Sequence, residues 1–170
     1  NEAMGYYLTN YTNYDTYSPD YTLSTNKKYP TQLLEILSIA KKLSKLYENI
    51  IIGGDSAGGT IAIQAALTTP SLFYSGFLLS PWMDLDGKYT PSYYSRSWND
   101  KYKTGDPIYK TDPITNLSTS KEIALKYLDN KSLFKNPIAN PVLATPDMLK
   151  KLPPFILFIG DDEVIRDGVI

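Results

Sequence analysis

The stretch that decides the fold is Ile50-Ile51-Ile52-Gly53-Gly54-Asp55-Ser56-Ala57-Gly58-Gly59-Thr60. A β-branched run leads into a turn of small residues, and an apolar helical pattern follows from Ile61 to Leu67. This order predicts a buried strand, a sharp turn and a helix. Residues 54–58 fit G-x-S-x-G, a pattern in which a strained strand-to-helix turn pushes a serine hydroxyl out of the sheet.

Each residue of this turn has an expected role. Gly54 and Gly58 leave room for the strand and the helix to close around the strained serine. Ser56 is the expected nucleophile, and the N–H of Ala57, at a helix N-terminus, is the expected oxyanion donor. Asp55 and Gly59 complete the turn. The alternative is a glycine-rich turn that only packs.

Two phosphate-binding loops are excluded by spacing. No Lys-Ser or Lys-Thr follows the glycines, as a P-loop requires, and the glycines do not fit G-x-G-x-x-G. The net charge of −1 gives no reason to expect nucleic acid or an anionic membrane surface as a partner. The lack of cysteine excludes disulfides and a thiolate metal site. No apolar run approaches the roughly 20 residues of a membrane span.

The sequence contains no histidine. A serine nucleophile needs a base to take its proton, and in nearly all such sites that base is histidine. Either the histidine lies beyond Ile170 or the chain does no such chemistry. A chain of 170 residues that begins Asn1-Glu2 rather than with Met suggests an internal fragment.

The remaining pattern predicts an α/β fold with a mostly parallel sheet flanked by helices. Residues 1–29 are polar and tyrosine-rich and are expected to form a loop with at most one edge strand. Leu33, Leu37, Ala40, Leu43 and Tyr47 recur at helical spacing after Pro30. Strands are expected over residues 49–53, 73–80 and 155–159, the first of them buried on both faces, with a helix over residues 57–69.

Residues 86–150 are expected to be an insertion or cap-like region within one incomplete domain of residues 1–170. Prolines punctuate this region, and one helix is expected from Ser120, as N-cap, to about Leu128. Either the region lines a substrate pocket or it is a structural excursion with its own packing. Its aromatic residues are Tyr89, Tyr93, Tyr94, Trp98, Tyr102 and Tyr109.

Several stretches together resemble the hormone-sensitive-lipase-like branch of the α/β-hydrolases, also called the α/β-hydrolase fold-3 esterases. The Gly-Asp-Ser-Ala-Gly-Gly hexapeptide at residues 54–59 is the most specific of them. The others are Asp20-Tyr21-Thr22-Leu23-Ser24 with Tyr29-Pro30, Ser80-Pro81-Trp82 with Asp84-Leu85, Asn136-Pro137 to Pro141, and Leu152-Pro153-Pro154 through Gly160 to Arg166-Asp167. Among fungal members, sterol-acetate esterases share this general pattern.

The resemblance implies a partial α/β-hydrolase fold with Ser56 as nucleophile and Ala57 as one oxyanion donor. Aligning Arg166-Asp167 with the Arg-Asp of the family puts Glu163 at the position of the triad acid, where aspartate is commoner. Asp161 and Asp162 are the alternatives. The His-Gly-Gly-Gly oxyanion stretch and the histidine of the family are missing from this sequence.

The expected function is therefore that of a serine carboxylic-ester hydrolase acting on a small, apolar ester, with no metal or cofactor. The 170 residues alone are expected to be inactive. The alternative is a non-catalytic hydrolase-like domain that binds an apolar ligand or a partner, and a thioesterase or peptidase on the same fold is a third reading. Sequons at Asn10, Asn116 and Asn130 permit the endoplasmic reticulum lumen, and the cytoplasm remains open.

Overall fold

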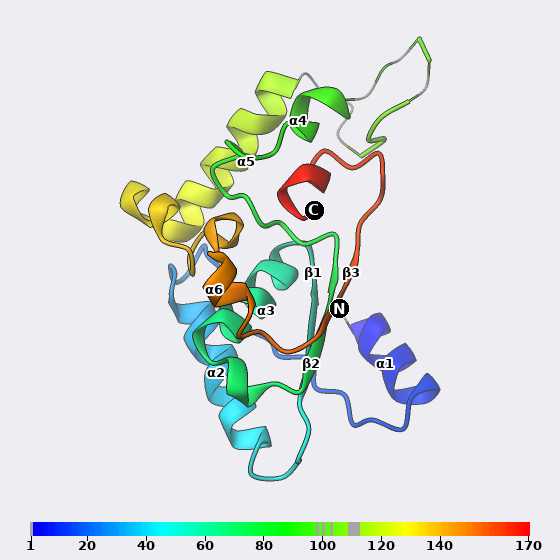
Figure 1. The fold of residues 1–170 in the computed structure, drawn as a ribbon, viewed down its shortest axis with the longest axis vertical. Coiled ribbons are helices and arrows are strands. Elements are labelled where there is room, and N and C mark those ends of the chain that lie inside the picture. Colours follow the sequence, from blue (N-terminus) through cyan, green and yellow to red (C-terminus); the bar gives the residue numbers. More distant parts are fainter. Residues whose placement is uncertain (1, 98, 100, 103, 109–112) are drawn as a thin grey trace.

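The computed structural model describes residues 2–97, 99, 101, 102, 104–108 and 113–170 (Figure 1). Its centre is a parallel sheet of three strands in the order β1-β2-β3. The strands run over Ile51–Asp55 (β1), Ser75–Leu79 (β2) and Phe155–Phe158 (β3). The α/β class and these strands are confirmed, with ends shifted by one or two residues.

Two helices cover one face of the sheet, α2 over Thr31–Leu43 and α3 over Ser56–Thr68. α3 is buried from Gly59 to Leu67 and connects β1 to β2, and Pro70 begins a 3₁₀ turn directly after it. The core lies between these helices and the sheet. It joins Leu33, Leu37 and Ala40 of α2 to Ile52, Ala62, Ile63, Ala65, Ala66, Leu67, Phe73 and Leu78.

The opposite face of the sheet is covered only in part. Ile51 is 40% exposed, Ile156 61% and Phe158 53%. The expectation that the first strand is buried on both faces was therefore wrong, because α2 and α3 both pack on the other side. The apolar run in β1 had indicated burial but could not indicate which elements would cover each face.

The N-terminal segment was also predicted wrongly. Residues 2–11 form a helix (α1, Glu2–Tyr11) rather than a loop with an edge strand. Its tyrosines are more than half exposed, at 69% for Tyr6, 59% for Tyr7 and 82% for Tyr11. Its partly buried apolar stripe consists of Met4 and Leu8 alone, which is too short for a sequence pattern to detect.

The described part of residues 86–150 lies beside and beyond the carboxyl ends of the strands (Figure 1). They hold α4 (Ser92–Ser95), α5 (Pro113–Leu128) and α6 (Pro146–Leu149), with 3₁₀ turns between α5 and α6. A second core cluster joins this region to the end of β2 through Leu85, Ala124, Leu128, Phe134 and Ala139. The buried Gln64 of α3 also binds this region to the sheet layer. Its side-chain N–H donates to the Ala139 carbonyl, and its side-chain oxygen accepts from the Tyr127 hydroxyl.

The predicted helix is present and ends at Leu128 as expected, but it starts earlier. The helix begins at Pro113, not at Ser120, since proline at the first position presets the helical φ and Ser120 then lies inside the helix. Of the aromatic residues, Tyr93 is buried, whereas Tyr89, Tyr94 and Tyr102 are each more than half exposed. Trp98 and Tyr109 lie outside the described residues.

Phenylalanine rings occupy the space above glycines on neighbouring strands. Gly76 is paired in register with Phe155, and a Cβ at Gly76 would lie 2.2 Å from the Phe155 ring. Gly53 and Phe77 repeat this arrangement on β1 and β2, also at 2.2 Å. Glycine is required at both positions, since any side chain would displace a ring.

We expect Gly76→Ala to destabilise the protein by about 1–3 kcal/mol, because the new methyl group drives the Phe155 ring out of the core. Gly5→Ala is the matched control: its Cβ would meet Thr16 at an ordinary 3.7 Å, and alanine favours the helix by about 0.5–1 kcal/mol. Denaturant unfolding of both variants measures the difference. Equal effects would contradict the ring-over-glycine packing.

Candidate active site

The turn between β1 and α3 holds Ser56 in an unusual backbone conformation. Asp55 is extended, with φ −110° and ψ 146°, and the next residue, Ser56, has φ +49°. A non-glycine residue in this left-handed region costs about 1–3 kcal/mol unless its surroundings impose the conformation. The Ser56 side chain is exposed at the first position of α3. The strained serine turn predicted from G-x-S-x-G is thus present.

Close backbone packing imposes this conformation. A Cβ at Gly54 would lie 2.4 Å from the Gly58 carbonyl group, and one at Gly59 would lie 2.8 Å from Pro81. A Cβ at Gly58 would meet nothing within 4 Å. The prediction that glycine is needed at position 58 to leave room was therefore wrong, because a side chain there would enter open space. Instead, the backbone of Gly58 lies against Gly54, and glycine is needed at position 54.

The segment after β2 fixes the turn from the other side. The Trp82 N–H donates to the Ser56 carbonyl at 3.2 Å, and the Thr60 hydroxyl donates to the Trp82 carbonyl. Parallel register aligns Asp55 with Leu79 and Leu79 with Phe158. The residues that follow these three positions therefore emerge at the same edge of the sheet, where parallel sheets carry their binding sites.

The N-terminal turn of α3 offers backbone donors. The first N–H groups of a helix have no intrahelical acceptor, and Ala57 lies exposed at this end. Tyr21 lies near the same turn, and its pKa is raised by burial and, to a lesser extent, by the negative charge of Asp55. The N–H groups at the start of α3 are therefore available to a ligand at this edge.

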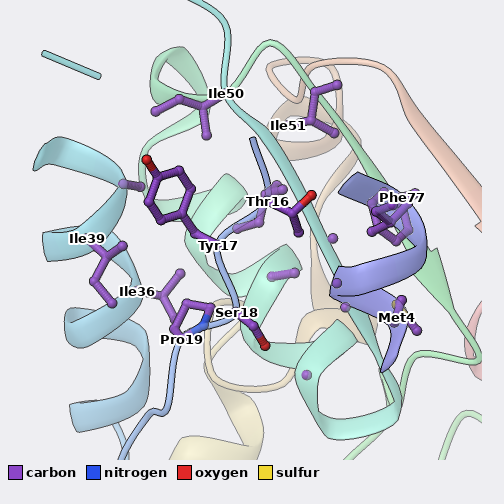
Figure 2. A pocket seen from close by; sticks show the side chains of 18 of the residues that line it. Met4, Thr16, Tyr17, Ser18, Pro19, Ile36, Ile39, Ile50, Ile51 and Phe77 are labelled. Carbon is purple, nitrogen blue, oxygen red and sulfur yellow. The ribbon is translucent and has the colours of Figure 1, made fainter. Parts of the chain in front are cut away.

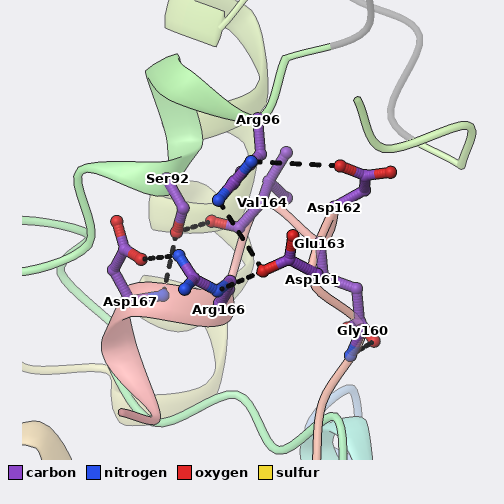
Figure 3. A network of polar contacts seen from close by, with 9 residues as sticks. All are labelled: Ser92, Arg96, Gly160, Asp161, Asp162, Glu163, Val164, Arg166 and Asp167. Atoms are coloured by element: carbon purple, nitrogen blue, oxygen red, sulfur yellow. Dashed lines mark hydrogen bonds and ion pairs between the residues drawn. The ribbon is translucent and has the colours of Figure 1, made fainter. Parts of the chain in front are cut away.

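The loop after β3 carries the three predicted carboxylates, and the structure separates them (Figure 3). Glu163 is half-buried, and its Oε1 accepts from the Ser80 hydroxyl at 2.6 Å and from the Gly160 N–H at 2.8 Å. Asp161 and Asp162 point outward, with side chains 78% and 63% exposed. Of these three carboxylates, Glu163 is the one that hydrogen bonds hold at the carboxyl ends of β2 and β3.

Two arginines hold the outer carboxylates. Arg166 Nε lies 3.1 Å from Asp161, and Arg96 lies 3.7 Å from Asp161 and 4.0 Å from Asp162. These pairs are largely exposed, so each contributes little to stability. Both aspartates thus face arginines and not Ser80 or Gly160.

Ser92 and Asp106 hold the same loop, a contact that the sequence did not reveal. The Ser92 hydroxyl donates to the Val164 carbonyl at 2.7 Å and accepts from the Asp167 N–H at 3.0 Å. The buried Asp106 accepts from the Val164 N–H at 3.0 Å. These bonds join positions 58 to 75 residues apart, so no local pattern could have indicated them.

A cavity of about 790 Å³ lies between α1 and the exposed face of the sheet and reaches Ser56 (Figure 2). Residues 16–19 run through its wall between α2 and β1, with Ile36 and Ile39 on one side and Ile51 on the other. Its lining is mainly apolar. Within the described chain β1 pairs only with β2, so the other edge of β1 is free. Much of the cavity runs along this free edge, and only the end of the cavity at Ser56 adjoins the candidate active site.

His, Cys, Asp and Glu side chains of the described chain form no group of three or more that could hold a metal ion. None of its helices is long and apolar enough to cross a membrane.

Comparisons with known proteins agree with this architecture. Residues 2–170 match a sequence profile described as alpha/beta hydrolase fold. A protein of Acanthamoeba polyphaga mimivirus named as a putative alpha/beta hydrolase is 26% identical over 160 residues, covering 87% of this chain and 42% of its own length. A protein of Schizosaccharomyces pombe named as a putative steryl acetyl hydrolase is 28% identical over 169 residues, covering 89% and 41%.

Solved structures are similar over the same part. An esterase of the bacterial hormone-sensitive lipase family superposes with a TM-score of 0.67 at 25% identity, covering 87% of this chain and 46% of that one. Carboxyl esterase 2 of the mycorrhizal fungus Tuber melanosporum gives a TM-score of 0.69 at 19% identity, covering 88% and 48%. The chain thus spans less than half the length of these relatives.

We expect Gly54→Ala to destabilise the protein by about 3 kcal/mol, because the methyl group meets backbone atoms of α3 that cannot move aside. Gly58→Ala is the matched control, since its methyl group enters open space, and we expect its stability to stay within about 0.5 kcal/mol of wild type. Thermal unfolding distinguishes the two. Loss of stability in both variants would show that crowding at Gly54 is not the constraint.

Proposed function

The chain belongs to the alpha/beta hydrolase fold family, and from that premise we propose that it carries the nucleophile and the acid of a serine esterase. In this proposal Ser56 Oγ attacks the carbonyl carbon of a carboxylic ester, the alcohol leaves with a proton, and an acyl-enzyme forms. Water then attacks the acyl carbonyl, releases the carboxylic acid and restores the Ser56 hydroxyl.

The observation that carries this proposal is the left-handed backbone of Ser56, with φ +49°, at an exposed strand-to-helix turn. Packing alone gives no reason to keep a serine in strained backbone, since glycine adopts this φ without the cost. A turn that presents a hydroxyl does need a serine there. The proposal of a non-catalytic binding domain leaves Ser56 unexplained.

The N–H of Ala57 is the proposed donor to the oxyanion that forms on the carbonyl oxygen. It lies in the first turn of α3, where free N–H groups and the positive end of the helix dipole favour negative charge. Such donors stabilise a charge that develops only during the reaction, which is why they accelerate it. Gly54, Asp55, Gly58 and Gly59 support the turn.

Glu163 is the proposed acid that orients a histidine. Its Oε1 is held by Ser80 and Gly160, and no donor of the described chain bonds to Oε2, which leaves that oxygen to accept from an imidazole N–H. Asp161 and Asp162 are less suited, because both are exposed and lie against Arg96 or Arg166. The histidine itself is not among these 170 residues, so the proposal concerns the whole protein.

The proposed substrate is a small carboxylic ester with an apolar part. The mainly apolar lining of the cavity that reaches Ser56 supports this choice, as do the relatives named as esterases or as a steryl acetyl hydrolase. The identities of the acyl group and the alcohol are left to a substrate series.

The test uses the protein expressed with its native flanking sequence. We expect a fluorophosphonate probe to label wild type and p-nitrophenyl acetate to be hydrolysed, and we expect Ser56→Ala to lose labelling and about 10⁴–10⁶-fold in kcat. Ser71→Ala, which changes an exposed serine outside the site, is the control and should behave as wild type. A folded wild type that resists the probe, or a labelled Ser56→Ala, would overturn the proposal.

A second experiment assigns the acid. We expect Glu163→Gln to lower kcat by about 10⁴-fold, because a neutral amide no longer stabilises the imidazolium. Asp161→Asn and Asp162→Asn are matched controls on the same loop and should keep kcat near the wild-type value. A large loss in either aspartate variant, with Glu163→Gln active, would move the acid to that aspartate.

A further inference from the structure

We infer that Ser80 is a positioning residue, whose hydroxyl fixes the carboxylate of Glu163 so that Oε2 is free for the histidine. The inference rests on the proposed function and adds a residue that the resemblance did not assign a role. Its basis is a hydrogen bond of 2.6 Å from Ser80 Oγ to Glu163 Oε1, which joins the ends of β2 and β3.

The two donors to Glu163 act on one oxygen. Ser80 Oγ and the Gly160 N–H both donate to Oε1, at 2.6 and 2.8 Å. Hydrogen bonds to an ionised group are shorter and stronger than neutral ones, and two donors that converge on one oxygen fix the carboxylate plane. Oε2 has no donor within the described residues. One carboxylate oxygen is therefore anchored while the other is open.

The backbone of Ser80 is adapted to this contact. Ser80 follows directly after β2 and has φ +42°, in the left-handed region that disfavours non-glycine residues. Its N–H donates to the Phe158 carbonyl of β3 at 2.7 Å. Both the N–H and the hydroxyl of Ser80 thus bond to the β3 side of the sheet. A glycine would relieve the strained φ but would remove the hydroxyl, which gives the serine a reason to be there.

The same tripeptide also touches the nucleophile turn. Pro81 packs against Gly59, and the Trp82 N–H donates to the Ser56 carbonyl at 3.2 Å. Ser80-Pro81-Trp82 therefore contacts Ser56 at one end and Glu163 at the other. Since three residues of chain set this spacing, Ser80 positions the acid relative to the nucleophile and not only within its own loop.

Gly160 provides an independent way to disturb the carboxylate. A Cβ at Gly160 would lie 2.9 Å from Glu163 Oε1 and 3.1 Å from its Cγ. The atoms in conflict belong to a flexible side chain, so the loop can remain folded while the carboxylate shifts. Gly160→Ala thus moves the acid without removing any hydrogen-bonding group of Ser80.

The experiment compares Ser80→Ala, Ser80→Gly and Gly160→Ala in the protein with its native flanking sequence. With p-nitrophenyl acetate we expect each to lower kcat by about 10–100-fold, with KM and the thermal midpoint near wild type, because a hydrogen bond to an ionised acid is lost or bent. Ser80→Gly relieves the strained φ, so its loss of kcat cannot be attributed to misfolding. Ser71→Ala again serves as the control.

A double-mutant cycle decides whether Ser80 acts through Glu163. In a Glu163→Ala background, which has no carboxylate to position, we expect Ser80→Ala to cause no further loss of kcat. An equal loss in both backgrounds would overturn the inference, as would a Ser80→Ala variant as active as wild type. If Ser56→Ala abolishes activity but Glu163→Ala does not, the esterase stands and the role of Ser80 fails. If Ser56→Ala stays active, both fail.

Discussion

The contact between Gly54 and the backbone of Gly58 and Gly59 is the constraint on which the site depends. It brings the end of β1 so close to the first turn of α3 that a methyl group at Gly54 would lie 2.4 Å from the carbonyl group of Gly58. Because the chain must turn within this space, Ser56 at the corner adopts left-handed backbone. The exposed Ser56 hydroxyl follows from this approach, and the free N–H groups of α3 lie beside it because the helix begins at the same corner.

The ends of all three strands are then joined through the residues after β2. Trp82 bonds to the carbonyl of Ser56, Pro81 packs on Gly59, and Ser80 bonds to Glu163. Ser80 and Ser56 share the same strained backbone region, at φ +42° and +49°. Two adjacent parallel strands are thus each followed by a serine in strained backbone, a feature that clusters at functional sites.

Local patterns predicted some elements well and others poorly for identifiable reasons. The strands β1, β2 and β3 and helix α3 carry continuous apolar runs, helix α2 carries a clear apolar period, and all were predicted within a few residues. Helix α1 has only a short apolar stripe, Met4 and Leu8, among exposed tyrosines, and it was predicted as a loop. Helix α5 begins seven residues before Ser120, at Pro113, because proline as a first helical residue competes with serine as an N-cap signal.

By itself the sequence determined the α/β class, the order of strands and helices, and the serine at a strand-to-helix turn, because each of these depends on residues close together in the chain. It could align Glu163 with an acid but could not separate it physically from Asp161 and Asp162. Only the tertiary structure did so, through Ser80, which lies 83 positions away, and through Arg96. Contacts between distant segments depend on how layers pack, and local periodicity does not encode that packing.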